Sequence, residues 1–448
     1  MTSAVSVSTT GEGSQGWAAS AIAEAKVRRA SWRSTALAAL TASAEQAWSK
    51  VLFPTPRMES WKYTNPEKVA KGSFKLAAAS STVKLSAKEI EPYLITGLDA
   101  HLIVLVDGVF APELSSTGEI AGARIARISE LAQVSEGDLP IGSSNAHCEE
   151  AFAALATALM VDGVSISVQR GERVQKSIHI VNVATTASNA TVVAPRLVID
   201  AEENSQVSVV ESHVAVAGGV YLSLPVTEIR AAQGANVDYV KFQNESRDAF
   251  HVSTTSVDQG RDATVRTHIF SFGGALVRNN AQVALNGSAS NAVLNGLSVL
   301  SGSQHVDNTT LIHHIEPSAE SREHFKGIYA DDSRGVFSGT ITVEKIAQKT
   351  NAFQSNQALL LSPSASIETR PQLKIWADDV KCTHGATVGQ LDADALFYLR
   401  SRGIDRDVAR NFLIHAFASE VLTSVENVKV REYLEGVLSG VLDTLARV

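Results

Sequence analysis

Cys382 and His384 have the residue types and the spacing that binding of a soft metal needs. The run from Lys374 to His384 contains isoleucine, tryptophan and valine, which favours an extended strand, and strand residues two apart project from one face. A thiolate beside an imidazole can bind a soft metal ion. Closed zinc sites and iron–sulfur clusters usually take four protein donors, so this pair supplies at most half of a site. The missing donors must come from elsewhere in this chain or from another protein.

Other polar side chains near this pair are weaker candidates. Asp378 and Asp379 could bind a hard metal, but neighbouring strand residues face opposite sides, so at most one can join the pair. Cys148 follows a histidine and is expected to be incidental. The alternative for Cys382 and His384 themselves is a buried cysteine and a hydrogen-bonded histidine that complete a strand.

Two histidine patterns further upstream also resemble metal sites. His313 and His314 are adjacent, and strand alternation sends their rings to opposite faces, which argues against a shared ion. His305 and Asp307 have the spacing of one strand face. We interpret them as a hydrogen-bonded pair that stabilises a turn.

The bulk composition bounds the class of protein. A chain of 448 residues exceeds the usual size of a single core, so two or three domains are expected. The formal net charge of −8 argues against nucleic-acid binding, because phosphate neutralisation needs clustered basic residues. The longest apolar run, residues 151–161, is shorter than the roughly 20 residues that span a bilayer. Two cysteines suit a reducing compartment, and we predict a cytoplasmic protein without membrane contact.

The first part of the chain divides into a tail and a mixed domain. Residues 1–16 are rich in serine, threonine and glycine and are predicted to be a disordered tail. Alanine dominates residues 17–50, which predicts one or two helices that Pro54 and Pro56 end. A strand over 102–106, a turn at Asp107 and Gly108 and a second strand over 109–110 indicate a hairpin. We assign residues 17–150 to an N-terminal helical and mixed domain.

The middle of the chain has the pattern of a β-solenoid. Short β-branched runs alternate with small polar turns at Asn204, Gly234, Gly260 and Gly287, which recur every 26 to 30 residues. A β-sandwich would also give regular short strands, but the length of this region without helices favours stacked coils. Residues 151–391 are therefore predicted to form the parallel β-helix core.

The last segment, residues 392–448, changes to helical periodicity. Asp392 and Asp405 are expected helix N-caps, and Gly403 suits the residue that ends the first helix. In the second helix Val408, Phe412 and Ala416 follow an apolar i, i+4, i+8 pattern. Three amphipathic helices here predict a small bundle or a docking surface.

Several motifs, in order along the chain, resemble the SufB/SufD family of iron–sulfur cluster assembly proteins, and within it the SufD branch. They lie at residues 57–64 (RMESWKYT), 106–115, 304–307, 347–350, 374–392 and 395–403. The resemblance implies a mainly β fold: a right-handed parallel β-helix core, flanked by an N-terminal α/β region and a C-terminal helical domain. It also implies a complex with a SufB-like scaffold and a SufC-like ATPase.

The resemblance implies roles for particular residues. His384 would face a cysteine of the scaffold at the heterodimer interface, with Cys382 beside it, so both are predicted metal ligands. The C-terminal helices would dock the ATPase. We predict the contact residues Leu396, Tyr398, Arg402, Phe412 and Phe417.

The predicted function is that of a non-catalytic subunit in iron supply and cluster assembly. The chain has no phosphate-binding loop of the G-x-x-x-x-G-K-[ST] type, so ATP would act through the ATPase partner. We expect no cofactor on the isolated chain and transient iron or cluster at the interface; the sequence leaves open whether a reduced flavin joins the complex and whether homodimers form.

Two alternatives belong to other classes. A polysaccharide-active β-helix enzyme would need acid, base or metal groups gathered on one solenoid face, and the sequence shows no compact carboxylate constellation. The paralogous scaffold SufB is a narrower alternative, against which the shortage of cysteine argues.

Overall fold

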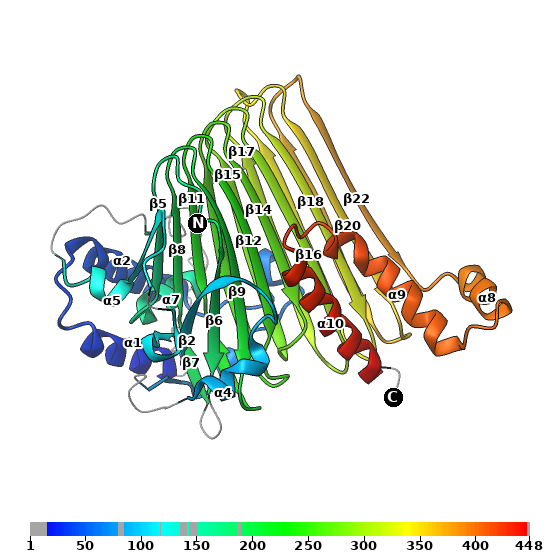
Figure 1. Cartoon of the computed structure of the whole chain (residues 1–448), viewed down its shortest axis with the longest axis horizontal. Helices are drawn as coiled ribbons and strands as arrows, with labels where there is room; N and C mark the ends of the chain where they lie inside the picture. Colours follow the sequence, from blue (N-terminus) through cyan, green and yellow to red (C-terminus); the bar gives the residue numbers. More distant parts are fainter. Residues whose placement is uncertain are drawn as a thin grey trace, which may run out of the picture.

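Two long β-sheets face each other and wind together as the coils of a solenoid (Figure 1). The structure is a computed structural model that describes residues 16–78, 85–116, 118–134, 141–142, 151–185 and 190–445. Within these residues one sheet has 12 strands and the other has 10. The prediction of a mainly β protein with a parallel β-helix core is confirmed.

The strands of each sheet are given in their order across the sheet. The first sheet runs β21 (Ser366–Ile375), β19 (Arg334–Val343), β17 (His305–His314), β15 (Leu276–Leu285), β13 (Phe250–Gln259), β11 (Val226–Ala231), β8 (Arg196–Ala201), β5 (Val164–Val168) and β4 (Ala123–Arg127), with β1 (Lys75–Leu76), β7 (Thr191–Val193) and β10 (Tyr221–Ser223) beside it. The second runs β22 (Lys381–Gly389), β20 (Asn351–Leu360), β18 (Glu320–Tyr329), β16 (Asn291–Leu300), β14 (Thr264–Ser271), β12 (Asn236–Asn244), β9 (Gln206–Ala215), β6 (Ser177–Ala184), β2 (Ala100–Val106) and β3 (Val109–Phe110).

Tight turns with left-handed backbone connect the two sheets at one equivalent place in successive coils. Such residues have positive φ, which asparagine, aspartate and glycine adopt most easily. They precede β9, β12, β14, β16 and β18 and are Asn204 (φ 57°), Gly234 (φ 67°), Asp262 (φ 57°), Ala289 (φ 57°) and Ser318 (φ 63°). The repeat of turns that the sequence indicates therefore corresponds to one turn per coil.

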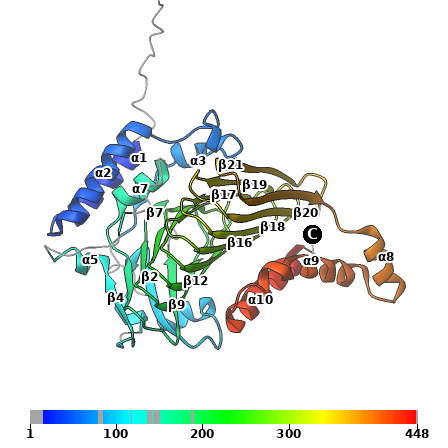
Figure 2. The ribbon, with the colours of Figure 1, turned by 90° about the horizontal axis from the view of Figure 1, so that it is seen from above.

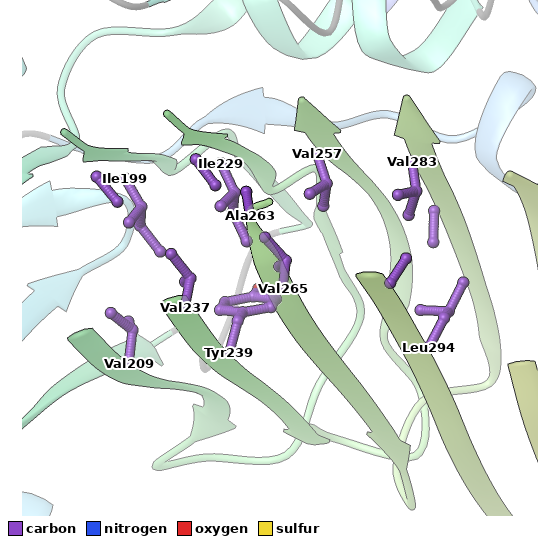
Figure 3. Close-up of a cluster of buried hydrophobic side chains, with 14 of the residues drawn as sticks. Ile199, Val209, Ile229, Val237, Tyr239, Val257, Ala263, Val265, Val283 and Leu294 are labelled. Carbon is purple, nitrogen blue, oxygen red and sulfur yellow. The ribbon is translucent and has the colours of Figure 1, made fainter. Parts of the chain in front are cut away.

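The main core lies between the two sheets. Inward-facing valine and isoleucine side chains stack in columns along the solenoid, as Ile199, Ile229 and Val257 do on the first sheet (Figure 3). Val209 and Val237 face them from the second sheet. Strand alternation explains the pattern, because every second residue of each strand enters the interior.

Helices cover the outer faces of both sheets (Figure 2). Helices α1 (Gly16–Arg28), α2 (Thr35–Val51) and α7 (Ala151–Leu159) pack with the outer side of the first sheet. The second sheet is covered by α10 (Val428–Leu445) and by the last turns of α9 (Arg406–Leu422). Shorter helices α3 (Glu67–Ala70), α4 (Ala87–Ile90) and α5 (Ile128–Leu131) lie in the N-terminal region.

The N-terminal elements largely follow the sequence prediction. The helices expected over residues 17–50 are α1 and α2, and the predicted hairpin is β2 with β3. Residues 151–159, at the start of the segment assigned to the β-helix, form helix α7 instead of a strand. The predicted disordered tail lies, except for Gly16, outside the described residues.

The two ends of the solenoid differ. At the N-terminal end the antiparallel strands β3 and β4 close the sheets, and Phe110 and Ile125 pack onto the interior core. At the C-terminal end β21 and β22 are the last strands of their sheets. In the described part of the chain, no helix has the length and apolar character required to cross a membrane.

A helical arm extends beyond this C-terminal end (Figure 1). It consists of α8 (Ala393–Ser401) and the first turns of α9. Asp392 and Asp405 accept hydrogen bonds from backbone N–H groups at the starts of these helices, as predicted. Gly403, with φ +86°, forms the turn between them.

Candidate functional site

Strand β22 is the edge strand that carries the predicted metal ligands. It pairs in parallel with β20, with Lys381 opposite Asn351, and it ends the second sheet. The N–H of Lys381 donates to the carbonyl of Thr350, 2.9 Å away, so alternate residues from Lys381 onward bond to β20. The N–H groups of Cys382, His384 and the other intervening residues therefore face the open edge.

Cys382 and His384 share the inner face of β22, as the sequence predicts. Their register partners on β20 are Ala352 and Gln354, which are both buried inside the solenoid. Cys382 is half-buried and packs against the interior core, whereas His384 is exposed at the open rung. The pair thus lies at the mouth of the solenoid, where another chain can reach it.

The thiol of Cys382 is not activated in the isolated chain. Burial raises its pKa above the ordinary value, and a hydrogen bond with the backbone of Ala352 offsets part of this effect. Because a thiolate is the form that binds metal, metal binding must displace the proton from Cys382.

The prediction of one continuous strand through the motif is wrong. Strand β21 ends at Ile375 and β22 begins at Lys381, with a turn over residues 376–380. Asp378 and Asp379 lie in this turn, and the Asp379 carboxylate forms a salt bridge with Lys349. The two aspartates are therefore not strand residues, as the prediction had them. Cys382 and His384 still share one face, because both lie within β22.

The described residues supply too few donors for a complete metal site. No group of three or more histidine, cysteine, aspartate or glutamate side chains converges in the described ranges in a way that could hold a metal ion. The thiol and imidazole at the edge of β22 are therefore an incomplete ligand set, and an additional chain would have to complete it.

Exposed apolar side chains surround this open rung. The exposed fractions are 55% for Trp376, 48% for Val388, 41% for Phe353 and 37% for Ile375. Large apolar groups gathered around an unpaired strand edge are typical of a protein interface. The open end therefore has both the hydrogen-bonding groups and the apolar surface for adding another chain.

The two edge strands differ in how well they can accept a further strand. In β21 the N–H of Ser366 donates to Ser333, so the odd-numbered positions face the open edge. Pro371 occupies one of these positions and has no N–H to donate. Because β22 contains no proline, it offers the more continuous edge of the two.

The predicted docking residues occupy two different parts of the helical arm. Tyr398 and Phe412 are more than half exposed, Arg402 is exposed and donates to the Tyr398 hydroxyl, and Leu396 is half-buried. Phe417 instead lies at the root of the arm. Its ring lies under Lys326 of β18, with the ammonium nitrogen 4.5 Å from the ring centre.

The root of the arm is fixed to the solenoid by Lys326. Its ammonium group donates to the carbonyl of Phe417 at 2.9 Å and to the carboxylate of Glu420 at 2.6 Å. The side chain of Lys326 is almost fully buried. A displacement of α9 would therefore act on β18, which pairs with β20 and through it with β22.

The predicted contact residues do not include two exposed residues of the arm, Phe397 and Val408, although Val408 belongs to the apolar stripe seen in the sequence. Their exposed fractions are 73% and 48%, and Phe397 is the most exposed aromatic side chain of the arm. The apolar period of α9 places Val408 in a stripe but does not tell which stripe stays exposed. The helix α9 buries Ala409, Ile414 and Ala418, so the stripe that contains Val408 and Phe412 is the outer one.

The motif at residues 57–64 binds the N-terminal region to the outer face of the first sheet. Trp61 lies under the guanidinium of Arg278, 4.0 Å from the ring centre, and Thr64 donates to Asp307 at 2.5 Å. His305 also contacts the Thr64 hydroxyl, at 3.0 Å. The interpretation of His305 and Asp307 as a pair that stabilises a turn is wrong, because both lie on strand β17 and each contacts the Thr64 hydroxyl in the packing of the N-terminal region.

The adjacent histidines His313 and His314 do not form a site. His313 faces outward and pairs with Glu344 at 2.8 Å, while His314 is buried and contacts Ser321 at 2.9 Å, so the predicted separation of the two rings is confirmed. Cys148 lies outside the described residues.

A second polar cluster lies deep inside the solenoid. Lys241 donates to His251 at 2.9 Å, and His251 contacts the carboxylate of Glu245 at 2.6 Å. Burial lowers the pKa of Lys241 to about 8, although the carboxylates of Glu211 and Glu245 act in the opposite direction. Because each charge has a nearby partner and the side chains are fully enclosed, we assign this cluster a structural role.

Two family models together match most of the chain. Residues 183–417 match the model described as "SUF system FeS cluster assembly, SufBD core domain", and residues 22–180 match the "SufBD protein N-terminal region". The chain belongs to the SufBD family. The core match contains β22 with Cys382 and His384 and most of the arm.

Individual SufBD proteins are similar over nearly the same length. A SufBD family protein for iron–sulfur cluster assembly from Synechocystis is 32% identical over 394 residues, which cover 83% of this chain and 84% of that protein. The iron–sulfur cluster assembly protein SufD of Escherichia coli is 32% identical over 377 residues, or 84% of this chain and 86% of SufD. This chain is thus a SufD homologue, and its family favours cluster assembly over the polysaccharide-active alternative.

Proposed function

We propose that this chain is a non-catalytic subunit of a SUF complex, in which it completes a cluster-assembly site together with a SufB-like scaffold. His384 and Cys382 would supply part of the ligand set for iron or for the nascent cluster, which are the substrates of the complex. The cytoplasmic location predicted from the sequence belongs to the same proposal.

The observation that carries this proposal is the position of an incomplete ligand pair on an open strand edge. A partner strand added to β22 would continue the second sheet and bring the partner's side chains next to His384. The apolar groups Trp376, Val388 and Phe353 would be covered by the same contact. Metal donors from two chains would then share one site, which the described residues of this chain do not form alone.

The helical arm supports the second partner in the proposal. Phe397, Tyr398 and Phe412 are exposed on the arm, which extends beyond the last coil (Figure 1). A SufC-like ATPase docked there would leave β22 free for the scaffold. Its movement would reach β18 through Lys326 and then the edge strand.

Replacement of His384 by alanine tests the proposed ligand role. The variant would be co-purified with the scaffold and the ATPase and supplied with iron and sulfide under anaerobic conditions. We expect loss of cluster formation, measured by absorbance and by iron content, together with unchanged association of the three subunits.

The matched control is His313→Ala, which removes a histidine from a strand face away from the open rung. This control should form clusters at the normal yield. A normal yield from His384→Ala in an intact complex would reject the role that we propose for His384.

A further inference from the structure

Three inward-facing side chains on successive strands form a column that leads from the interior to the open rung. Glu323 of β18 is the register partner of Gln354 on β20, and Gln354 is the register partner of His384 on β22. Neighbouring strands are about 4.8 Å apart, so side chains at these positions stack on one another. Glu323 and Gln354 are fully buried, and His384 is exposed.

The amide of Gln354 is held at one end and free at the other. Its Nε2 donates to the carboxylate of Glu323 at 2.6 Å. Its Oε1 is buried and accepts no hydrogen bond from the described residues. Gly339 on the facing sheet leaves the space for this amide, because a methyl group there would overlap Gln354. A buried carbonyl without a donor is unfavourable, so a bonding partner is to be expected in some state of the protein.

A histidine that binds metal needs an acceptor of the kind that Gln354 offers. One ring nitrogen binds the metal, and the other usually donates its N–H to an oxygen atom that fixes the tautomer and the ring orientation. In the described structure His384 takes part in no side-chain hydrogen bond. The free Oε1 of Gln354 lies one strand inward on the same face.

We propose that Gln354 is a positioning residue for the metal ligand His384, and that Glu323 fixes Gln354 in the required orientation. The imidazole donates one N–H to Gln354 Oε1, and the Glu323 carboxylate accepts from Gln354 Nε2, which keeps the oxygen turned toward the open rung. This inference rests on the proposed function, since it gives a role to the nitrogen of His384 that does not bind metal.

The variant Gln354→Leu removes the acceptor and keeps a buried side chain of similar size. Asn356→Leu is the matched control, because Asn356 is also a buried amide on the inner face of β20 and donates to Thr369 at 3.0 Å. Its register partner on β22 is Ala386, so its loss does not affect an imidazole. One strand further inward in the column, Glu323→Gln keeps an oxygen acceptor for Gln354, whereas Glu323→Leu removes it.

The first readout is the tautomer of the His384 ring in the full-length chain, measured by NMR of nitrogen-15-labelled histidine without metal. The signal is assigned by its absence in His384→Ala. We expect Gln354→Leu and Glu323→Leu to change the tautomer ratio, and Asn356→Leu and Glu323→Gln to leave it unchanged. Equal ratios in the Gln354→Leu variant and the unmodified protein would overturn the inference.

The second readout is the binding of iron(II) alone to the complex of this chain with the scaffold. Loss of such an outer hydrogen bond typically weakens metal affinity by about 10- to 100-fold, and we expect this range for Gln354→Leu. An equal loss in Asn356→Leu would assign the effect to general destabilisation and overturn the inference. If His384→Ala abolishes binding while Gln354→Leu does not weaken it, the proposed function stands and the positioning role falls. If His384→Ala has no effect, the proposed function fails, while the tautomer ratio still tests the contact.

Discussion

At the scale of single residues, the site is built from strand alternation. The two-residue spacing of Cys382 and His384 is enough to predict their shared face, because alternation holds wherever the backbone is extended. The roles of Gln354 and Glu323 could not be predicted in this way. In the sequence they look like ordinary solvated polar residues, and only the register of β18, β20 and β22 places them behind His384.

Glu323 gives a prediction for stability against pH. Burial raises its pKa from 4.5 to about 7, while Thr310 and Gln354 act in the opposite direction. The folded protein therefore holds this proton more tightly than the unfolded chain, so the stabilisation is complete below pH 4.5 and is lost as the pH rises toward 7. The difference in pKa corresponds to about 3 kcal/mol.

The variant Glu323→Gln should not lose stability in this way as the pH rises, because its amide stays neutral. Relative to the unmodified chain, its free energy of unfolding should be larger at pH 7.5 than at pH 5 by about 2 kcal/mol. Urea unfolding at the two pH values measures this change. A difference between the two proteins that is the same at both pH values would contradict the assignment.

At the scale of elements, the sequence predicts the type of each unit better than its contacts. The turn residues and the β-branched runs indicate stacked coils, and the caps Asp392 and Asp405 locate the C-terminal helices. The break between β21 and β22 was missed, because the run around Trp376 has strand composition while its backbone turns. Which helix stripe stays exposed was also not predictable, since α9 carries two apolar stripes and the packing of its end decides between them.

Ala386→Pro tests the open edge of β22. The N–H of Ala386 faces away from β20, so its loss should leave the intrachain ladder intact and block strand addition. We expect the affinity for the scaffold, measured by isothermal titration calorimetry, to fall by about tenfold or more. The free energy of unfolding should change little.

The control for this edge is Thr387→Pro, because the N–H of Thr387 faces β20. This substitution removes a ladder hydrogen bond and should destabilise the chain by about 1–3 kcal/mol. Undiminished scaffold binding by a folded Ala386→Pro variant would show that β22 is not the contact.

At the scale of the whole molecule, both candidate binding surfaces lie at one end of the solenoid. One end is closed by β3 and β4, and the other presents β22 and, beyond it, the α8–α9 arm (Figure 1). The arm is exposed at its tip and anchored at its root by Lys326. In the proposed complex, this arrangement would let two partners bind at the same time, and β18 and β20 would connect the root of the arm to β22.

Substitution of Phe412 by aspartate tests the arm. Central aromatic residues of an interface often contribute 2 kcal/mol or more, so we expect about 30-fold weaker binding of the ATPase. Binding of the scaffold should not change, because the strand edge is unaltered. The control Val27→Asp alters another exposed apolar residue, on α1, and should bind both partners normally. Pull-down with purified ATPase distinguishes these outcomes, and normal ATPase binding by Phe412→Asp would contradict the docking role.

The most direct test of the shared site is spectroscopic detection of the bond between His384 and the cargo. The complex would contain this chain labelled with nitrogen-15 histidine and an unlabelled scaffold, and the reduced cluster would be studied by pulsed electron paramagnetic resonance. We predict a nitrogen-15 coupling to the cluster, which is absent when this chain is left unlabelled. A cluster that forms in the complex and shows no coupling to the labelled chain would contradict the account.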